Sequence, residues 1–255
     1  MKICFTTSLF GDLSTLDRPA TFTRVDNCDY FLFTDITSNL ESSWDVINLK
    51  NNKIINELSS SIKKSRYPKF LSWQILESMG FDYDVIFYCD SCFYPNPNGD
   101  WGGLSSQIVN HSGFSFVQTV HQNPAVRNGG ILAEMALIID HKRDSLESMQ
   151  NTQKIFDEID HTISLRQPQY YENTCFGFCF NDQIVRDITT EFWGIYSKPE
   201  VTYRDQPLWN FLLLKNKLTP LIKNDFKYNT NNFINELSWF IFCPQNLGTM
   251  RSNYI

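Results

Sequence analysis

The sequence predicts an α/β fold in which a mostly parallel central sheet carries helices on both faces. Short apolar runs alternate with segments of helical period through the first half of the chain, as in parallel strands joined by helices. Two of these runs are continuously apolar, which is typical of strands buried on both faces, and each ends on an acid, Asp35 or Asp90. A chain of 255 residues, of which 42% are hydrophobic, can bury the core of one large domain.

The expected strands are short runs rich in β-branched and aromatic residues. One of them, residues 44–49, alternates between apolar and polar side chains, as an edge strand does. In chain order, the expected strands are residues 3–7, 30–34, 44–49, 85–88, 113–120, 175–180 and 219–222.

The expected helices are segments whose apolar side chains recur every three or four residues. In the first of them, Pro68 should kink the helix, end it or start its second half, because proline cannot donate the backbone hydrogen bond. In chain order, the expected helices are residues 58–79, 130–148, 152–160, 183–192 and 206–214.

Two loops and a C-terminal segment complete the expected organisation. Residues 8–12 contain Gly and Asp, and residues 93–99 are rich in Pro and Asn, so both are expected to be loops. We expect residues 1–225 to form one domain. Residues 226–255 mix Asn with aromatic side chains and are expected to wrap around that domain or to cover it as a lid.

Charge and hydropathy exclude several classes of protein. A formal net charge of −6 disfavours a nucleic-acid partner, because phosphate contacts require a basic face. No apolar run approaches the roughly 18 residues of a membrane-spanning helix, and no signal peptide precedes the first strand, so we expect a soluble cytoplasmic protein without a transmembrane segment. No G-x-G-x-x-G follows the first strand, which excludes a Rossmann dehydrogenase.

The seven cysteines fit reduced thiols better than a metal site. Cys89 and Cys92, together with Cys175 and Cys179, have spacings that resemble a four-thiolate zinc site. However, Cys89 ends an apolar run, and Cys175 and Cys179 lie within another. Buried thiols in a reducing compartment are therefore expected.

Charged residues at the ends of elements are the candidates for chemistry. Asp90 follows a continuous apolar strand, where it would either face a ligand at the edge of the sheet or cap the next turn. Asp205 directly precedes an expected helix. Four cations, Lys63, Lys64, Arg66 and Lys69, fall within seven residues of an otherwise acidic chain.

These segments, in this order, resemble the GT-A glycosyltransferases, most closely a glycosyltransferase-like group known from plant cell-wall proteins and from bacterial and viral polysaccharide genes. The resemblance covers about residues 2–215. It implies a GT-A-like, Rossmann-like sheet and an enzyme that uses a nucleotide-sugar donor and a glycan or glycoconjugate acceptor. The matching segments are residues 2–11, 28–35, 65–69, 85–91, 171–177 and 204–206.

The resemblance implies a donor site at the carboxyl ends of the strands. Thr6, Thr7 and Asp35 would line the nucleoside pocket, although Asp35 could instead be a turn residue. Arg66 and Lys69 would lie near the donor diphosphate, where cations replace or assist a metal. Lys63 and Lys64 could equally belong to a solvated helix face.

The same resemblance implies a divalent metal, Mn²⁺ or Mg²⁺, held by an Asp-x-Asp motif. In this chain the motif is Asp90-Ser91-Cys92, so the second acid is missing, and a thiol is a poor ligand for Mg²⁺. Either Asp90 binds the metal with water and phosphate oxygens, or the enzyme has little metal dependence. Asp90 and Ser91 would face the donor in both cases.

Asp205 is the candidate general base for a transfer with inversion, since one carboxylate must take the proton of the acceptor hydroxyl. A helix N-cap is the alternative role for this residue. By resemblance, Glu172 and Asn173 lie on the acceptor side. Glu134 is another matched acid that could equally be an exposed helix residue, and His121, which follows a strand, could enter the site.

Two other functions are compatible with such a sheet. A sugar-1-phosphate nucleotidyltransferase would need a Gly-rich basic loop after the first strand, and residues 8–12 contain one Gly and no base. A catalytically inactive module that binds a nucleotide or a glycan is favoured by the loss of an acid at Cys92. The presence of Arg66 and Asp205 favours the enzyme.

Overall fold

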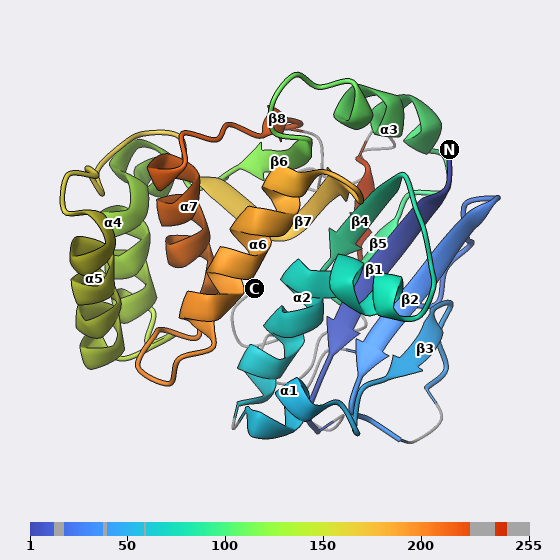
Figure 1. Cartoon of the computed structure of the whole chain (residues 1–255), viewed down its shortest axis with the longest axis horizontal. Helices are drawn as coiled ribbons and strands as arrows, with labels where there is room; N and C mark the ends of the chain where they lie inside the picture. Colours follow the sequence, from blue (N-terminus) through green and yellow to red (C-terminus); the bar gives the residue numbers. More distant parts are fainter. Residues whose placement is uncertain (13–17, 38–39, 59, 225–237, 244–255) are drawn as a thin grey trace.

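A seven-stranded sheet with the order β3-β2-β1-β4-β7-β6-β8 forms the centre of the fold (Figure 1). The computed structural model describes residues 1–12, 18–37, 40–58, 60–224 and 238–243. The strands of this sheet are β1 (Ile3–Leu9), β2 (Cys28–Thr34), β3 (Asp45–Asn48), β4 (Val85–Cys89), β6 (Phe116–Val120), β7 (Tyr171–Cys179) and β8 (Leu221–Ile222).

The sheet is mostly parallel, as predicted. β1 pairs in parallel with β2 and with β4, and β2 with β3, while β6 pairs in parallel with β8. Only β7 runs antiparallel to its neighbours β4 and β6 among the strands of this sheet. As a result, the amino end of β7 lies at the same edge as the carboxyl ends of β4 and β6.

The chain reverses its direction of travel across the sheet between β1 and β4. It runs outward from β1 to β2 and β3, and then returns to place β4 on the other side of β1. In open α/β sheets, ligands bind outside the carboxyl ends of the strands at such a reversal. A ligand site is therefore expected at the residues that follow β1 and β4.

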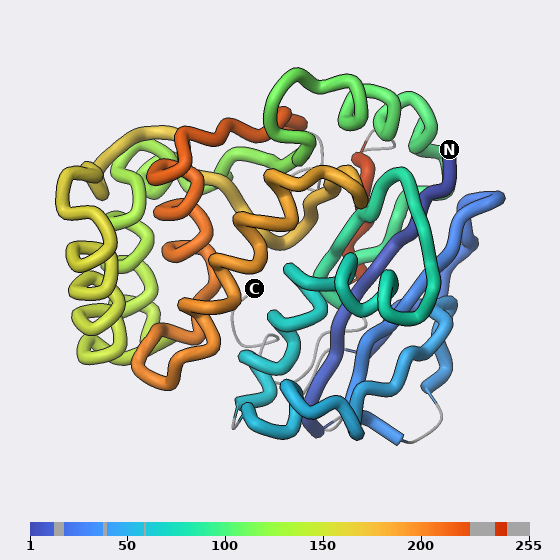
Figure 2. The backbone as a smooth tube through the Cα atoms, in the orientation of Figure 1, coloured from blue at the N-terminus to red at the C-terminus, as the bar shows by residue number. Residues whose placement is uncertain are grey.

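Helices cover both faces of the sheet unevenly. The helices are α1 (Lys53–Glu57), α2 (Ser61–Ser78), α3 (Trp101–Val109), α4 (Pro124–Asp140), α5 (Leu146–Asp160), α6 (Gln183–Tyr196) and α7 (Asp205–Lys215). Successive side chains of β4 point to opposite faces: Ile86 and Tyr88 pack in the core with α2, α4, α6 and α7, whereas Val85 and Phe87 pack with α3. The tube trace shows α2, α6, α7, α4 and α5 following one another across the first face (Figure 2).

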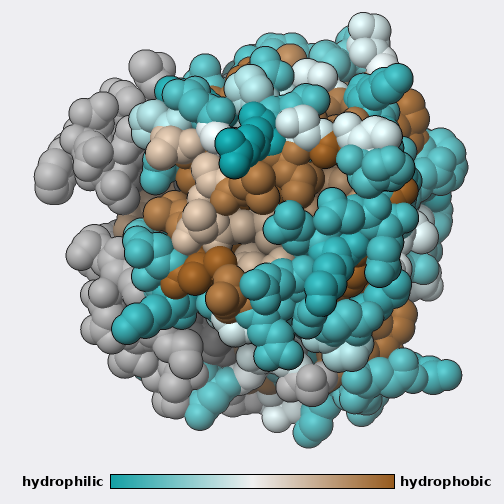
Figure 3. Space-filling view, turned by 90° about the vertical axis from the view of Figure 1, so that its left-hand side faces the viewer, coloured by the Kyte–Doolittle hydropathy of each residue, from teal (hydrophilic) through white to brown (hydrophobic). Residues whose placement is uncertain are grey.

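The end of the molecule formed by α4 and α5 has a mixed surface. Apolar side chains gather near the middle of this face and polar side chains surround them (Figure 3). No helix in the part of the chain that the structure describes is both long enough and apolar enough to cross a membrane.

The helix predicted at residues 58–79 is α2 (Ser61–Ser78), and a separate short helix, α1, precedes it. The Asn52 side chain accepts a hydrogen bond from the Ile55 backbone at the start of α1, and Ser60 does the same for Lys63 at the start of α2. Pro68 remains inside α2, and the backbone leaves the helical region one turn later, at Leu71 (φ −116°, ψ 25°). The predicted helix and its kink are confirmed, and the helix begins three residues later than predicted, after the Ser60 cap.

The boundaries predicted for the next two helices, 130–148 and 152–160, were also wrong. α4 begins earlier, where Asn123 caps it and Pro124 takes the first turn, and it breaks at Gly130 (φ 68°, ψ −150°). A Cβ at Gly130 would lie 2.5 Å from the Gln167 carbonyl oxygen, so both the conformation and the space require glycine. α5 begins after the Ser145 cap, well before the predicted start.

Residues 93–99 are not all loop, which corrects a second prediction. β5 (Phe93–Pro95) pairs antiparallel with β9 (Phe240–Phe242) in a small separate sheet. Because the two partners are far apart in the sequence, neither shows a local hairpin pattern. Apart from residues 238–243, the C-terminal segment at 226–255 lies outside the described residues, so its role as a wrap or lid stays a prediction.

Candidate functional site

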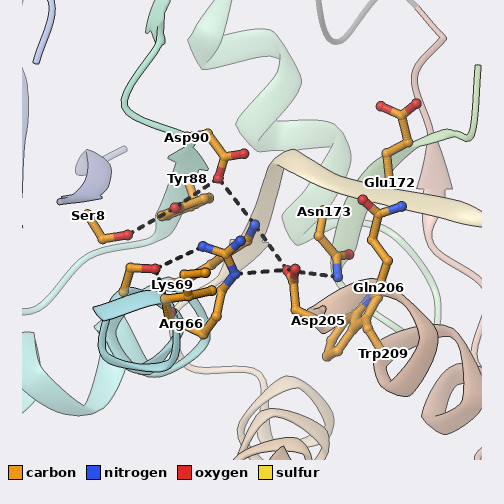
Figure 4. A network of polar contacts seen from close by, with 12 residues as sticks. Ser8, Arg66, Lys69, Tyr88, Asp90, Glu172, Asn173, Asp205, Gln206 and Trp209 are labelled. Atoms are coloured by element: carbon orange, nitrogen blue, oxygen red, sulfur yellow. Dashed lines mark hydrogen bonds and ion pairs between the residues drawn. The ribbon is translucent and has the colours of Figure 1, made fainter. Parts of the chain in front are cut away.

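Four charged side chains meet at the sheet edge where the chain reverses direction (Figure 4). Asp90 follows β4, Asp205 is the first residue of α7, and Arg66 and Lys69 lie three residues apart on α2, so they share one helix face. We call Arg66, Lys69, Asp90 and Asp205 the charge cluster. Three elements far apart in the sequence therefore supply one compact arrangement.

Lys69 bridges the two acids of the charge cluster. Its Nζ lies 3.3 Å from Asp90 Oδ1 and 3.1 Å from Asp205 Oδ2, and its side chain is 2% exposed. The ammonium also lies 5.1 Å from the centre of the Tyr88 ring, within the range of a cation–π contact. A buried ammonium is stable only with such partners, because removing it from water is costly.

Arg66 pairs with the other oxygen of Asp205. Its Nε lies 3.2 Å from Asp205 Oδ1, and its Nη1 donates to Ser65 Oγ at 2.9 Å. Burial lowers the pKa of the guanidinium, but the carboxylates of Asp205 and Asp90 outweigh burial and raise it overall. Arg66 is therefore a permanent positive charge in the site.

Asp205 is held ionised by these cations. Burial would raise the pKa of its carboxyl, but Lys69, Arg66 and Arg204 hold that pKa well below its usual range. Arg204, not Asp205, occupies the N-cap position of α7, and no side chain caps this helix. The alternative of an N-cap role for Asp205 is therefore wrong, and its carboxylate is directed to Lys69 and Arg66 instead.

A chain of buried hydrogen bonds fixes Asp205 from the side of the sheet. Asn173 Nδ2 donates to Asp205 Oδ2 at 3.3 Å, and Gln118 Nε2 donates to Asn173 Oδ1 at 2.9 Å. Trp209 Nε1 donates in turn to Gln118 Oε1 at 3.0 Å. Because each amide uses both its donor and its acceptor, the chain locks one orientation of the Asp205 carboxylate.

A second chain of hydrogen bonds fixes Asp90. Tyr88 OH donates to Asp90 Oδ1 at 3.1 Å, and Ser8 Oγ lies 3.0 Å from Tyr88 OH. Burial and the Asp90 carboxylate raise the pKa of Tyr88, so the phenol keeps its proton. Sequence reasoning missed Ser8 and Tyr88, although their register on neighbouring parallel strands, with Thr6 opposite Tyr88, puts them on one face.

Two of the residues predicted to line the nucleoside pocket, Thr6 and Thr7, lie within a strand and not beyond its end. Thr6 and Thr7 lie inside β1, which continues to Leu9, and both are fully buried. Thr6 Oγ1 donates to the Phe87 carbonyl at 3.3 Å, so its hydroxyl is occupied within the sheet. Thr6 and Thr7 therefore support the edge rather than extend from it.

Asp35 directly follows β2, and Ser91 lies just beyond the end of β4, on the other side of β1. Asp35 Oδ1 accepts a hydrogen bond from the Gly11 backbone at 3.1 Å, and Asp35 Oδ2 lies 3.6 Å from Lys64 Nζ. The first contact joins the ends of β1 and β2, as the turn alternative requires, and the second joins the end of β2 to α2. Ser91 is buried directly after Asp90.

The solvated helix face proposed for Lys63 and Lys64 was wrong. Lys63 is buried, its ammonium donates to the Lys198 carbonyl, and burial lowers its pKa. Lys64 is paired with Asp35. Both lysines connect α2 to neighbouring segments, while Arg66 and Lys69 point into the charge cluster.

Glu172 and Asn173 belong to β7, which begins four residues earlier than predicted. Asn173 donates a hydrogen bond to Asp205 and so supports the charge cluster. Glu172 Oε1 instead accepts a hydrogen bond from the Gln122 backbone at 3.0 Å, beyond the end of β6. Figure 4 shows Glu172 and Gln206 on the side of Asp205 away from Asp90. The structure thus separates the two residues that sequence reasoning grouped.

The described side chains around Asp90 do not by themselves make a complete ligand set for a divalent cation. Cys92 is 1% exposed and packs with the core on the α3 face, so it cannot serve as the missing ligand. The Lys69 ammonium lies between Asp90 and Asp205, where a cation bridging two carboxylates would lie. The described residues contain no group of three metal-binding side chains, and we assign no step to a metal.

The cysteines are thiols, and Cys4, Cys89, Cys92 and Cys175 are buried as expected, while the other three are partly buried. Burial raises the pKa of Cys89, which keeps its thiol protonated.

No protein-family model matches the chain, and no curated protein matches it. The functional argument therefore rests on the geometry of the site.

Proposed function

We propose that the chain is a nucleotide-sugar-dependent glycosyltransferase that moves a sugar onto a hydroxyl group of a glycan with inversion. The observation that carries this proposal is the pair of cations, the buried Lys69 and the largely buried Arg66, beside Asp90 at the edge where the sheet order reverses. Ligands of open α/β sheets bind at this position. The resemblance of the same segments to GT-A glycosyltransferases supports the assignment.

The two cations match the charge of a donor diphosphate. A guanidinium offers several donors in a fixed plane and an ammonium offers a compact charge, and both bind phosphate oxygens well. Without a donor, Arg66 and Lys69 are balanced by Asp205 and Asp90. A bound diphosphate competes for these contacts and receives donors that the buried elements already hold in place.

Asp205 suits the role of an anchor for these cations. One of its oxygens faces Arg66 and the other faces Lys69 and Asn173. A carboxylate with a strongly lowered pKa accepts a proton poorly at neutral pH, whereas an efficient general base has a pKa closer to the working pH. We therefore propose that Asp205 orients Lys69 and Arg66, in place of the base role that its position before α7 first indicated.

A catalytically inactive module that binds a nucleotide or a glycan is the second candidate. Two observations favour it: the second acid of the motif is replaced by the buried Cys92, and Asp205, the base expected from the sequence, is held in ion pairs. Such a module would keep the donor site and lack turnover. Binding and transfer must therefore be measured separately.

The decisive experiment is a calorimetric screen of the purified chain against UDP-, GDP-, TDP- and CMP-sugars, followed by donor hydrolysis and transfer assays. We expect one class of donor to bind, and Lys69→Met to weaken that binding at least tenfold. Lys215→Met is the matched control, because Lys215 pairs with Glu191 at the far end of α7. If Lys69→Met fails to fold, it is replaced in the test by Lys69→Arg, which keeps a positive charge. Donor binding without hydrolysis or transfer would favour the module, and absence of binding to every donor would overturn the transferase and the nucleotide-binding form of the module.

A further inference from the structure

A second group of polar side chains, two of them buried, lies near Asp205, outside the charge cluster. Glu134 projects from α4, His121 directly follows β6, and Tyr170 directly precedes β7. His121 Nε2 lies 3.7 Å from Glu134 Oε2, and the rings of His121 and Tyr170 are 5.7 Å apart. We call Glu134, His121 and Tyr170 the Glu134 cluster, which lies at the same sheet edge as Asp90.

Two members of this cluster are buried with unsatisfied polar atoms. Glu134 is 3% exposed and Tyr170 is 1% exposed, and neither Glu134 Oε2 nor Tyr170 OH makes a hydrogen bond within the described part of the chain. Gln206 Nε2, on the next residue after Asp205, is a third such atom. Since about nine in ten buried polar groups are satisfied, such a concentration near one edge indicates a bound polar partner.

The alternative that Glu134 is an exposed helix residue is wrong, because its side chain is buried. The pKa of Glu134 is shifted in the opposite direction to that of Asp205. Burial raises the pKa of Glu134. Arg204 and Arg143 lower it, and the carboxylates of Glu172 and Asp205 raise it again, so the net shift is upward. The charged and titratable groups around Glu134 are His121, Arg143, Tyr170, Glu172, Arg204 and Asp205.

We propose that the Glu134 cluster is the acceptor subsite and that Glu134 Oε2 takes the proton of the attacking hydroxyl group. This inference rests on the proposed function. The acceptor oxygen forms a bond to the anomeric carbon of the donor sugar while the bond from that carbon to the diphosphate oxygen breaks. The bonding electron pair leaves with the nucleoside diphosphate, and the hydroxyl proton passes to Glu134.

Each of the side chains around Glu134 has a separate role in this proposal. Tyr170 OH has a proton to donate to an acceptor oxygen, because burial raises the pKa of the phenol. His121 contacts the carboxylate of Glu134 and orients it, which makes it a positioning residue. Asp205 separates the two halves of the site: it pairs with Lys69 and Arg66 on the donor side, and it raises the pKa of Glu134 and Tyr170.

The test compares Glu134→Gln with Asp140→Asn, a control at the exposed end of the same helix. We expect Glu134→Gln to keep the donor affinity within twofold and to lose transfer by about 10²- to 10⁴-fold, the usual contribution of a general base. The acidic limb of the pH profile for kcat/KM of the acceptor should disappear in this variant. Asp140→Asn should leave binding and transfer unchanged.

The outcomes separate this inference from the proposed function. If the wild-type chain binds and transfers a sugar but Glu134→Gln transfers within threefold of it with the same pH profile, the assignment of Glu134 is overturned and the transferase stands. If the wild-type chain binds no donor, both fall. If Glu134→Gln fails to fold, the subsite is tested with Tyr170→Phe, which removes only a hydroxyl group. We expect Tyr170→Phe to raise the KM for the acceptor several-fold without changing donor affinity, and an unchanged KM would contradict the subsite.

Discussion

The ammonium of Lys69 lies 3.1 Å from a carboxylate oxygen of Asp205, and both side chains are almost completely buried. Each is costly to bury alone, and the contact makes both charges tolerable. Because Lys69 also reaches Asp90, this one side chain ties α2 to α7 and to the end of β4. The stability of the sheet edge and the proposed donor binding therefore depend on the same ion pairs.

Replacement of Asp205 by Asn should destabilise the fold. The change leaves Arg66 and Lys69 buried without their shared carboxylate, and breaking a buried ion pair typically costs about 3–5 kcal/mol. Urea unfolding gives the free energy directly, with Asp157→Asn on the exposed side of α5 as the control. A loss below about 0.5 kcal/mol, typical of surface changes, would contradict the role of Asp205 as an anchor.

The same carboxylate predicts how stability changes in acid. The pKa of Asp205 is lowered in the folded state from an ordinary value of 3.8, so its stabilising contribution is present above that pH. It is lost as the pH falls through the lowered folded-state pKa. The difference in unfolding free energy between the wild type and Asp205→Asn should therefore be constant from pH 7 to 5 and shrink below pH 4. A constant difference down to pH 2 would show that the carboxylate is not stabilised in its ionised form.

Donor binding should be indifferent to divalent metal. The Lys69 ammonium already lies between Asp90 and Asp205, and Cys92 faces the opposite core. We expect the Kd for the donor to change by less than about twofold when Mn²⁺ is added or removed with EDTA, as measured by calorimetry. A tenfold or larger gain with Mn²⁺ would show instead that the donor phosphates complete a metal site at Asp90.

Restoring the missing acid should not create a metal site. In Cys92→Asp the new carboxylate would enter the apolar core beside α3, where an unpaired charge is costly. We expect a loss of about 3 kcal/mol in unfolding free energy and no Mn²⁺ dependence of donor binding, with Cys92→Ser as the milder control. A stable variant that binds Mn²⁺ would require residues 91–92 to turn toward the charge cluster.

We expect replacement of glycine by alanine to have opposite effects on stability at Gly130 and at Gly194. Gly130→Ala should destabilise by about 1–3 kcal/mol, because Gly130 has φ 68° and a Cβ there would meet the Gln167 carbonyl. Gly194→Ala, in α6, should stabilise by up to about 1 kcal/mol, since a Cβ at that position meets nothing within 4 Å and alanine favours helix. Thermal unfolding of the two variants checks both signs, and equal effects would contradict the break in α4.

Much of the site was predictable from local pattern, and the rest depends on long-range packing. A strand-end acid and an acid before a helix indicated Asp90 and Asp205. The local pattern showed only four cations within seven residues, and the resemblance singled out Arg66 and Lys69 among them. Alternation within strands contained the information for Ser8 and Tyr88, but the hydroxyl of Tyr88 was hidden in an apolar run.

Burial of individual helix residues could not be predicted in the same way. Glu134 and Lys63 lie in segments of mixed composition, and only the packing of α4 and α2 against distant elements shows that both are buried. The pairing of β5 with β9 likewise joins residues about 145 positions apart. No window of local sequence contains such a pairing.

The pairing of β5 with β9 also sets an order of events during synthesis. β5 begins three residues after Asp90, and its partner strand is made only when residues 240–242 emerge. Contacts between residues so distant in the chain form late, since the loop between them must close first. On the ribosome, the segment that follows Asp90 therefore waits for the final part of the chain, so a nascent chain that stops before residue 238 should present this edge incompletely folded.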